Sequence, residues 1–193
     1  ILRKLNKNKD NKNIMNMDPI FNIPILLKKR WVQFLNKEQL KNIALQHLII
    51  PPALDIAFKE TRDIEKYETL LNGIKLGTKN IRILKPKGKI ANFCGYKEGK
   101  WWIQDIAAQV PCKVLINSLP KNPKVIDMCA APGGKTSQLI SYGSEVTALE
   151  KSSERTKILS NNLKRLNLKA EIINIDANYW TPNELVDAVL IDA

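Results

Sequence analysis

The sequence has few of the residues that build metal and disulfide sites. It contains one histidine and three cysteines, Cys94, Cys112 and Cys129, and these cysteines lack the close spacing of a zinc-binding pair. We therefore expect no metal site. A sparse, odd set of cysteines is typical of a reducing compartment rather than of a secreted disulfide scaffold, and it predicts a cytoplasmic protein.

Long apolar segments are also missing. No run approaches the roughly 20 residues that a membrane-spanning helix needs, so we expect no association with membranes. Hydrophobic residues still make up 44% of the chain, which is enough for a packed core. The chain begins with Ile1 rather than Met and ends in a short apolar run at Ala193, as if a strand were interrupted there. We expect it to be a fragment of a longer protein.

Acidic residues are scarce in the first half of the chain. Of the 31 Lys/Arg and 19 Asp/Glu residues, residues 1–100 hold 21 and 9, whereas residues 101–193 hold 10 of each. The formal net charge of +12 therefore belongs to the first half. This division indicates either an anion-binding module joined to a different unit, or a lysine-rich solvated surface that reflects genome composition. Composition alone leaves both interpretations open.

The first half is expected to form a linker and a small module. Residues 1–17, rich in Lys and Asn, predict a linker or the tail of a lost upstream domain. Residues 18–99 predict a basic, RRM-like α/β module with helices over 25–35, 38–49 and 64–71 and strands over 54–58, 81–83 and 90–96. A turn with three lysines, at 85–89, either binds RNA phosphates or makes a surface hairpin soluble.

The second half predicts an α/β fold of the Rossmann type. A segment that starts at Trp101 leads into an expected helix ending near Leu115. Strands and helices then alternate, and the strands are nearly continuous apolar runs, as in a parallel sheet covered by helices. The expected strands are 124–129, 145–149, 170–175 and 186–191, and the expected helices are 136–142 and 153–166. Residues 100–193 would thus be the N-terminal part of a doubly wound sheet, truncated after its fourth strand.

A loop of small residues follows the first of these strands. Ala130, Ala131, Gly133 and Gly134 carry almost no side chain, so a ligand can approach the backbone at the carboxyl end of the strand, where such folds bind ligands. Lys135 stands in the first helical turn, where the helix dipole opposes a cation. It therefore indicates a nearby anion, such as a phosphate or a ligand carboxylate, unless it points to solvent.

Three acidic residues follow three consecutive expected strands. Glu150 ends the second strand, Asp176 the third and Asp192 the fourth. A carboxylate in the position of Glu150 accepts hydrogen bonds from both hydroxyls of a ribose. One in the position of Asp176 can accept from an exocyclic amine, as on adenine. Because the strands are expected to be parallel, all three acids should line the same edge of the sheet.

Two other nucleotide-binding patterns fit less well. A P-loop requires Gly, four residues and then Gly-Lys-Ser/Thr, and Gly134, Lys135 and Thr136 satisfy its end. Cys129 stands where the first glycine should be, and Pro132 has no N–H to give to a phosphate. The nicotinamide fingerprint Gly-x-Gly-x-x-Gly is absent from the sequence. A P-loop-like nucleotide-binding domain and a non-catalytic RNA-binding fragment remain the alternatives.

The run Asp-Met-Cys-Ala-Ala-Pro-Gly-Gly-Lys-Thr at 127–136 resembles the first motif of the Sun/RsmB family of RNA cytosine-C5 methyltransferases. The segment 99–105 is similar to the stretch before that motif, and Glu150, Asp176 and Asp192 are in register with the later ones. Segments 24–31 and 51–56 look closest to the bacterial 16S rRNA enzymes of the family. In those enzymes a NusB-like domain precedes the region, and only its tail would remain in residues 1–17.

The resemblance implies S-adenosylmethionine as cofactor and 16S ribosomal RNA as partner, and we expect a monomer. By position, Glu150 would hold the ribose, Asp176 the adenine edge, and Asp192 would lie beside the methyl donor and the target base. Asp127 and Arg155 would hold these cofactor-binding residues in position. The methionine part of the cofactor would be wrapped by the loop residues Cys129, Ala130, Ala131, Pro132, Gly133, Gly134 and Lys135.

The resemblance also implies covalent catalysis by a cysteine outside this chain. In the family, a thiolate attacks C6 of cytosine, C5 then takes the methyl group, and a base removes the C5 proton. Pro-Cys follows the Asp-Ala of the last motif there, and the nucleophilic cysteine lies farther on, so both are expected beyond Ala193. No catalytic residue is assigned here, and the fragment itself is expected to be inactive. Cys94 and Cys112 are expected to be ordinary small buried residues.

Overall fold

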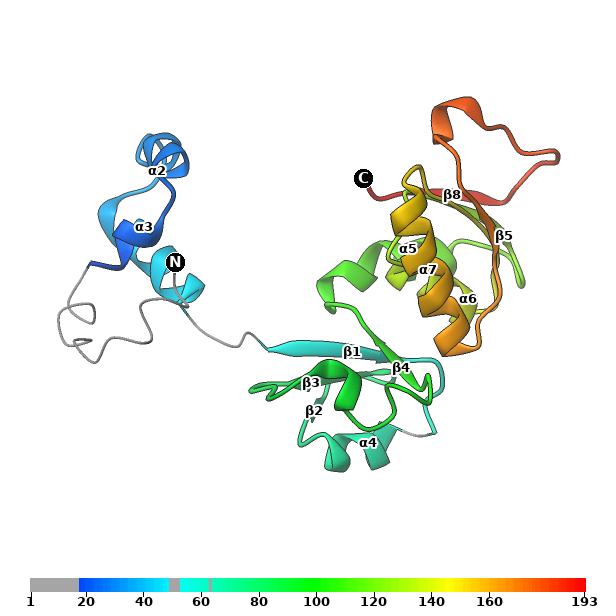
Figure 1. Cartoon of the computed structure of the whole chain (residues 1–193), viewed down its shortest axis with the longest axis horizontal. Coiled ribbons are helices and arrows are strands. Elements are labelled where there is room, and N and C mark those ends of the chain that lie inside the picture. The colour runs from blue at the N-terminus through cyan, green and yellow to red at the C-terminus, as the bar shows by residue number, and fades with distance from the viewer. Residues whose placement is uncertain (1–17, 49–52, 63) are drawn as a thin grey trace. The chain divides into compact units, whose positions relative to one another are not determined.

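A computed structural model describes residues 18–48, 53–62 and 64–193, and its chain divides into two compact units, residues 1–52 and 53–193 (Figure 1). The linker expected over residues 1–17 lies outside the described residues. The division that the sequence suggests between residues 99 and 100 stays a prediction. Among the described residues, no helix is long and apolar enough to cross a membrane.

The first unit is a small helical cluster. Asp18 caps a short 3-10 helix, η1 (Pro19–Asn22), and α2 (Ile25–Trp31) and α3 (Lys37–His47) follow. Asn36 and Gln39 form a capping box at the start of α3, which satisfies backbone N–H groups there. Both helices are confirmed, with earlier ends than expected. Their core consists of Ile20, Ile23, Leu40 and Ala44.

The second unit contains two four-stranded sheets. The first has the order β2-β3-β1-β4 and is antiparallel throughout, with α4 (Ile64–Leu70) packed beside it. Its strands are β1 (Leu54–Phe58), β2 (Ile74–Lys75), β3 (Asn80–Ile83) and β4 (Trp101–Ile103). The core of this sheet is built around the fully buried side chains of Phe58, Ile81 and Trp101.

One expected strand of the first sheet is wrong, and strand β4 was missed. Residues 90–96 do not form a strand. They form a 3-10 helix, η2 (Ile90–Asn92), and then turns in which Gly95 has a φ of 84°. The segment from Trp101 leads into a helix as expected, over 107–117, but its first three residues also pair with β1 as a fourth strand that was not predicted. Burial of Trp101 in the core explains this choice, since a strand places that side chain inward.

The second sheet is parallel, with the order β7-β6-β5-β8, and confirms the expected Rossmann-like architecture. Its strands are β5 (Lys124–Met128), β6 (Glu145–Leu149), β7 (Glu171–Ile173) and β8 (Ala188–Ile191). The helices of this half are η3 (Ala107–Gln109), α5 (Val110–Asn117), α6 (Gly134–Ser141), α7 (Ser153–Leu166) and η4 (Ala177–Tyr179). Ser152 caps α7 by accepting a hydrogen bond from the N–H of Arg155.

A buried chain of amides joins the two sheets. Gln104, just after β4, accepts from the Trp102 indole at 2.7 Å and donates to Oε1 of Gln138 in α6 at 2.7 Å. Gln138 donates to the carbonyl oxygen of Gln109 at 2.9 Å, and Gln109 donates to Oδ1 of Asn80 in β3 at 2.6 Å. The helix that follows the glycine loop is therefore tied directly to the antiparallel sheet.

Arg165 of α7 makes a second connection. Its guanidinium donates to the carbonyl oxygens of Tyr96 and Trp101, at 2.8 and 3.1 Å, and lies 4.0 Å from the centre of the Tyr96 ring. Gly99 lies against the backbone of the same helix, with a φ of 63°, and a Cβ there would be 1.9 Å from the carbonyl oxygen of Arg165. A side chain at residue 99 would push the two sheets apart.

Replacing Gln138 by leucine is expected to lower the free energy of unfolding by about 2–4 kcal/mol. The substitution leaves the amide of Gln104 and the carbonyl of Gln109 without their buried partner, and each such group costs about 1–3 kcal/mol. Urea denaturation followed by circular dichroism measures the change. Asn161→Leu, at an exposed position of α7, is the control and should change stability by no more than about 0.5 kcal/mol. Equal stability of the two variants would contradict a stabilising role for the network.

Candidate functional site

The loop between β5 and α6 is held in a tight turn by its backbone. Cys129 and Gly133 both have left-handed conformations, with φ of 63° and 101°. The N–H of Ala130 donates to the carbonyl oxygen of Leu149 in the neighbouring strand at 2.9 Å, and the N–H of Gly133 donates to that of Ala130 at 2.8 Å. A Cβ at Gly133 would lie 2.7 Å from the Leu159 side chain, so this position needs glycine both for its φ and for space.

Asp127, in strand β5, fixes the position of the loop that follows this strand. Its carboxylate is buried and accepts a hydrogen bond at 2.6 Å from the hydroxyl of Thr136, in the first turn of α6. Burial raises the pKa of Asp127 to about 6, although the Thr136 hydrogen bond acts in the opposite direction. The strand end and the helix start are thereby fixed relative to each other, which agrees with the supporting role expected for this residue.

Arg155 bridges the loop and the end of β6. Its guanidinium donates to the carbonyl oxygen of Ala131, and its Nε lies 3.6 Å from Oε2 of Glu150. The arginine stands in the first turn of α7, and its side chain is about half exposed. It thus supplies positive charge at the point where the loop and the strand end meet.

Glu150 is buried and only partly satisfied. It follows β6 with 5% of its surface exposed, and its Oε1 accepts from the N–H of Ser152 at 2.9 Å. Its Oε2 has no hydrogen-bond partner among the described residues. The residue lines a cavity of about 840 Å³, together with Cys129, Arg155 and Asp176. A buried carboxylate oxygen that lacks a donor, at the edge of a cavity, is suited to accept a ligand hydroxyl.

Asp176 and Lys151 form the far side of this cavity. The Lys151 ammonium donates to the Asp176 carboxylate at 2.8 Å, and this hydrogen bond holds the pKa of Asp176 below its usual value. Asp176 also caps η4 by accepting from the N–H of Asn178 at 3.1 Å. Its carboxylate therefore already accepts from Lys151 and Asn178, and a ligand amine would have to share the carboxylate oxygens with them.

Asp192 is the anion that the position of Lys135 indicated. The Lys135 ammonium forms an ion pair with the Asp192 carboxylate, across the end of β8. Both residues line a second cavity of about 430 Å³, together with Asp127, Cys129 and Arg155. Because Cys129 and Arg155 border both cavities, the loop and the three strand-end acids form one continuous candidate site.

The structure therefore brings together the residues that the sequence singled out, and it adds others. The N–H of Ser152 and the side chain of Lys151 were missed, because a residue type alone does not indicate a backbone donor or a lysine that bends back to a strand end. The expectation for Cys94 is wrong, because it is exposed on a turn, whereas Cys112 is buried as expected. Within the described residues, no group of three or more His, Cys, Asp or Glu side chains could hold a metal ion.

A family model described as 16S rRNA methyltransferase RsmB/F matches residues 114–193, the stretch that contains the loop and all three acids. This part of the chain is therefore similar to the RsmB/F family. Curated relatives agree with the assignment. Ribosomal RNA small subunit methyltransferase B of Vibrio vulnificus is 42% identical over 105 residues, which are 51% of this chain and 24% of that protein. The protein of the same name from Photorhabdus laumondii is 35% identical over 118 residues, 58% of this chain and 27% of the relative.

Solved structures confirm the fold of the chain. NSun6 from Pyrococcus horikoshii with SFG aligns with a TM-score of 0.70 at 16% identity, over 88% of this chain and 70% of that chain. A methyltransferase homologue from the same organism aligns with a TM-score of 0.62 at 21% identity, over 82% and 54%. The chain spans about a quarter of the length of the curated relatives given above.

Proposed function

We propose that this chain is the cofactor-binding part of an S-adenosylmethionine-dependent methyltransferase that modifies C5 of a cytosine in 16S ribosomal RNA. The buried Oε2 of Glu150 carries the proposal, because it lies at the strand end that faces the glycine loop and accepts no hydrogen bond within the described part of the chain. A ribose diol would supply the missing donor. The match of residues 114–193 to the RsmB/F family model supports the reaction and the rRNA substrate.

The residues of the site fit the parts of the cofactor one by one. The backbone of residues 129–135 would surround the methionine part, where Lys135 and Arg155 offer positive charge to its carboxylate. Glu150 would accept from the ribose hydroxyls, and Asp176 from the adenine amine. Asp192 would lie beside the methyl donor and the target base. When bound, S-adenosylmethionine supplies a methyl group activated on a sulfonium.

The basic first half suits the proposed partner. Its excess of Lys and Arg would attract the phosphates of ribosomal RNA. The proposed enzyme would be cytoplasmic and monomeric. The nucleophilic cysteine of the proposed reaction would be supplied from outside residues 1–193. This chain would then contribute cofactor binding and RNA positioning to the reaction, without the covalent step.

Isothermal titration calorimetry tests the proposal against the P-loop alternative. We expect S-adenosylmethionine to bind the chain and Mg-ATP not to bind, because Glu150 would repel a triphosphate and Pro132 offers it no N–H group. S-adenosylhomocysteine, which shares the ribose and adenine, should bind as well and serves as the positive control. Binding of Mg-ATP without binding of S-adenosylmethionine would overturn the proposed function.

A further inference from the structure

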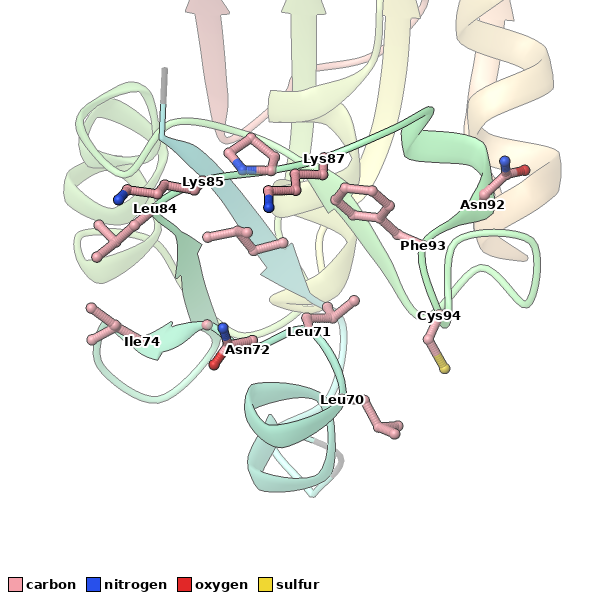
Figure 2. A pocket seen from close by; sticks show the side chains of 13 residues that line it. Leu70, Leu71, Asn72, Ile74, Leu84, Lys85, Lys87, Asn92, Phe93 and Cys94 are labelled. Atoms are coloured by element: carbon pink, nitrogen blue, oxygen red, sulfur yellow. The ribbon is translucent and has the colours of Figure 1, made fainter. Parts of the chain in front are cut away.

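A groove on the antiparallel sheet is separate from the cofactor site. It has a volume of about 900 Å³ and lies between the end of α4, strand β2 and the loop that follows β3. Figure 2 shows Lys85, Lys87 and Phe93 on the side of that loop, opposite Leu70 and Leu71. We call it the Phe93 groove. It is lined by Leu70, Leu71, Asn72, Gly73, Ile74, Ile83, Leu84, Lys85, Pro86, Lys87, Asn92, Phe93 and Cys94.

The lining combines apolar surface with unpaired positive charge. Leu71 and Phe93 pack against the core of the sheet and remain partly exposed, and both line the groove. Lys85 and Lys87 are exposed and form no ion pair within the described residues. None of the residues that line the groove is acidic.

This combination selects a particular class of ligand. An apolar ligand alone would gain nothing from two unpaired lysines, and a compact anion would gain nothing from Leu71 and Phe93. A single-stranded nucleic acid uses both features, because each nucleotide joins a flat base that stacks on an aromatic ring to a phosphate that attracts lysine. The amides of Asn72 and Asn92 add donors and acceptors for base edges.

We propose that the Phe93 groove holds one unstacked base of single-stranded RNA against the Phe93 ring, with the adjacent phosphates on Lys85 and Lys87. The inference rests on the proposed function for the identity of the substrate as RNA. It adds to that function a second contact site, on a different sheet from the cofactor. The base held there would be one that flanks the modified cytosine rather than the cytosine itself.

The three cysteines of the chain provide a direct test. Cys94 lines the groove and is exposed, and Cys129 lies in the cofactor loop and is also exposed. Cys112 is buried, and burial raises the pKa of its thiol to about 12, so it should resist alkylation. Alkylation of the native chain with iodoacetamide, followed by mass spectrometry, therefore reads the two sites separately in one sample.

We expect a short, unstructured RNA oligonucleotide to protect Cys94, and S-adenosylmethionine to protect Cys129 but not Cys94. A duplex of the same sequence should protect Cys94 much less, because its bases are stacked and paired. If the single strand leaves Cys94 as reactive as in the free chain while S-adenosylmethionine protects Cys129, the groove inference is overturned and the proposed function stands. If RNA protects Cys94 but S-adenosylmethionine does not bind, the proposed function fails instead.

Substitutions test the role of the ring. Phe93→Leu keeps apolar bulk in the groove but removes the stacking surface, and should weaken binding of the single-stranded oligonucleotide by at least about fivefold, measured by fluorescence anisotropy. Phe34→Leu is the matched control, since Phe34 is 82% exposed and does not line the groove. Equal affinities of the two variants would overturn the stacking contact.

The lysines are tested by the dependence of affinity on salt. Lys85→Gln combined with Lys87→Gln should reduce the slope of log affinity against log salt by about one to two, because each lysine releases counterions from one phosphate. Lys121→Gln combined with Lys169→Gln changes two exposed lysines outside the groove and keeps the same net charge as the first pair. An identical slope for both double variants would show general attraction to a basic surface and would overturn the phosphate contacts.

Discussion

Replacing Glu150 by glutamine is expected to weaken the binding of S-adenosylmethionine by roughly 10- to 150-fold. Hydrogen bonds to a charged group contribute about 1.5–3 kcal/mol, and glutamine keeps the shape of the side chain while losing the charge. The amide would also turn one hydrogen-bond acceptor into a donor, facing the ribose hydroxyls. Isothermal titration calorimetry of the two proteins measures the difference.

Glu154→Gln is the matched control for this substitution. Glu154 lies in the first turn of the same helix, α7, is exposed, and does not line either cavity of the site. Its substitution removes the same charge and should leave the affinity for the cofactor within about twofold of the original, because exposed charges interact weakly in water. An unchanged affinity for Glu150→Gln would remove the main support for the proposed cofactor site.

Replacing Asp127 by asparagine is expected to make the protein more stable at neutral pH, by up to about 3 kcal/mol. The pKa of Asp127 is raised to about 6 by burial, so the folded chain holds this proton over a range of pH in which the unfolded chain has lost it. The contribution of Asp127 to stability therefore falls as the pH rises from about 4 to about 6, and stays low above that. Asparagine removes this loss and can still accept the hydrogen bond of Thr136.

Urea denaturation at a series of pH values checks this expectation. The difference in unfolding free energy between Asp127→Asn and the original should be small near pH 4, grow through the window up to pH 6 and then level off. Asp105→Asn, at an exposed position, serves as control and should have an effect below about 0.5 kcal/mol. If this difference in unfolding free energy became smaller as the pH rises, the ionised carboxylate of Asp127 would stabilise the folded chain. That result would contradict our interpretation.

The parallel half of the molecule could be predicted from sequence because its signals are local. Each of its strands is a short apolar run, and each is followed by a loop or a cap that a few residues define, such as Ser152 before α7. The antiparallel sheet was harder to predict. Its fourth strand, β4, has three residues and pairs with β1, more than forty residues earlier in the chain. Nothing local marks Trp101–Ile103 as a strand, although the helix that it leads into was predicted.

The site shows the same division between local and distant information. The residues of the loop and the three acids were identified because parallel strands end at one edge. The partner of Lys135 was not, because Asp192 is 57 residues away and only the pairing of β5 with β8 brings it close. The exposure of Cys94 could not be foreseen either. It depends on the turns that replace the expected strand over residues 90–96.

The close contact at Gly99 has a consequence for how the enzyme would choose its target. A backbone approach that leaves no room for a methyl group, together with the buried amides beside it, makes the two sheets one rigid body rather than two domains on a hinge. A base on Phe93 and a cofactor whose ribose is bound by Glu150 would then be held a constant distance apart. The modified cytosine would then be the one that lies a fixed number of nucleotides from the base bound at Phe93.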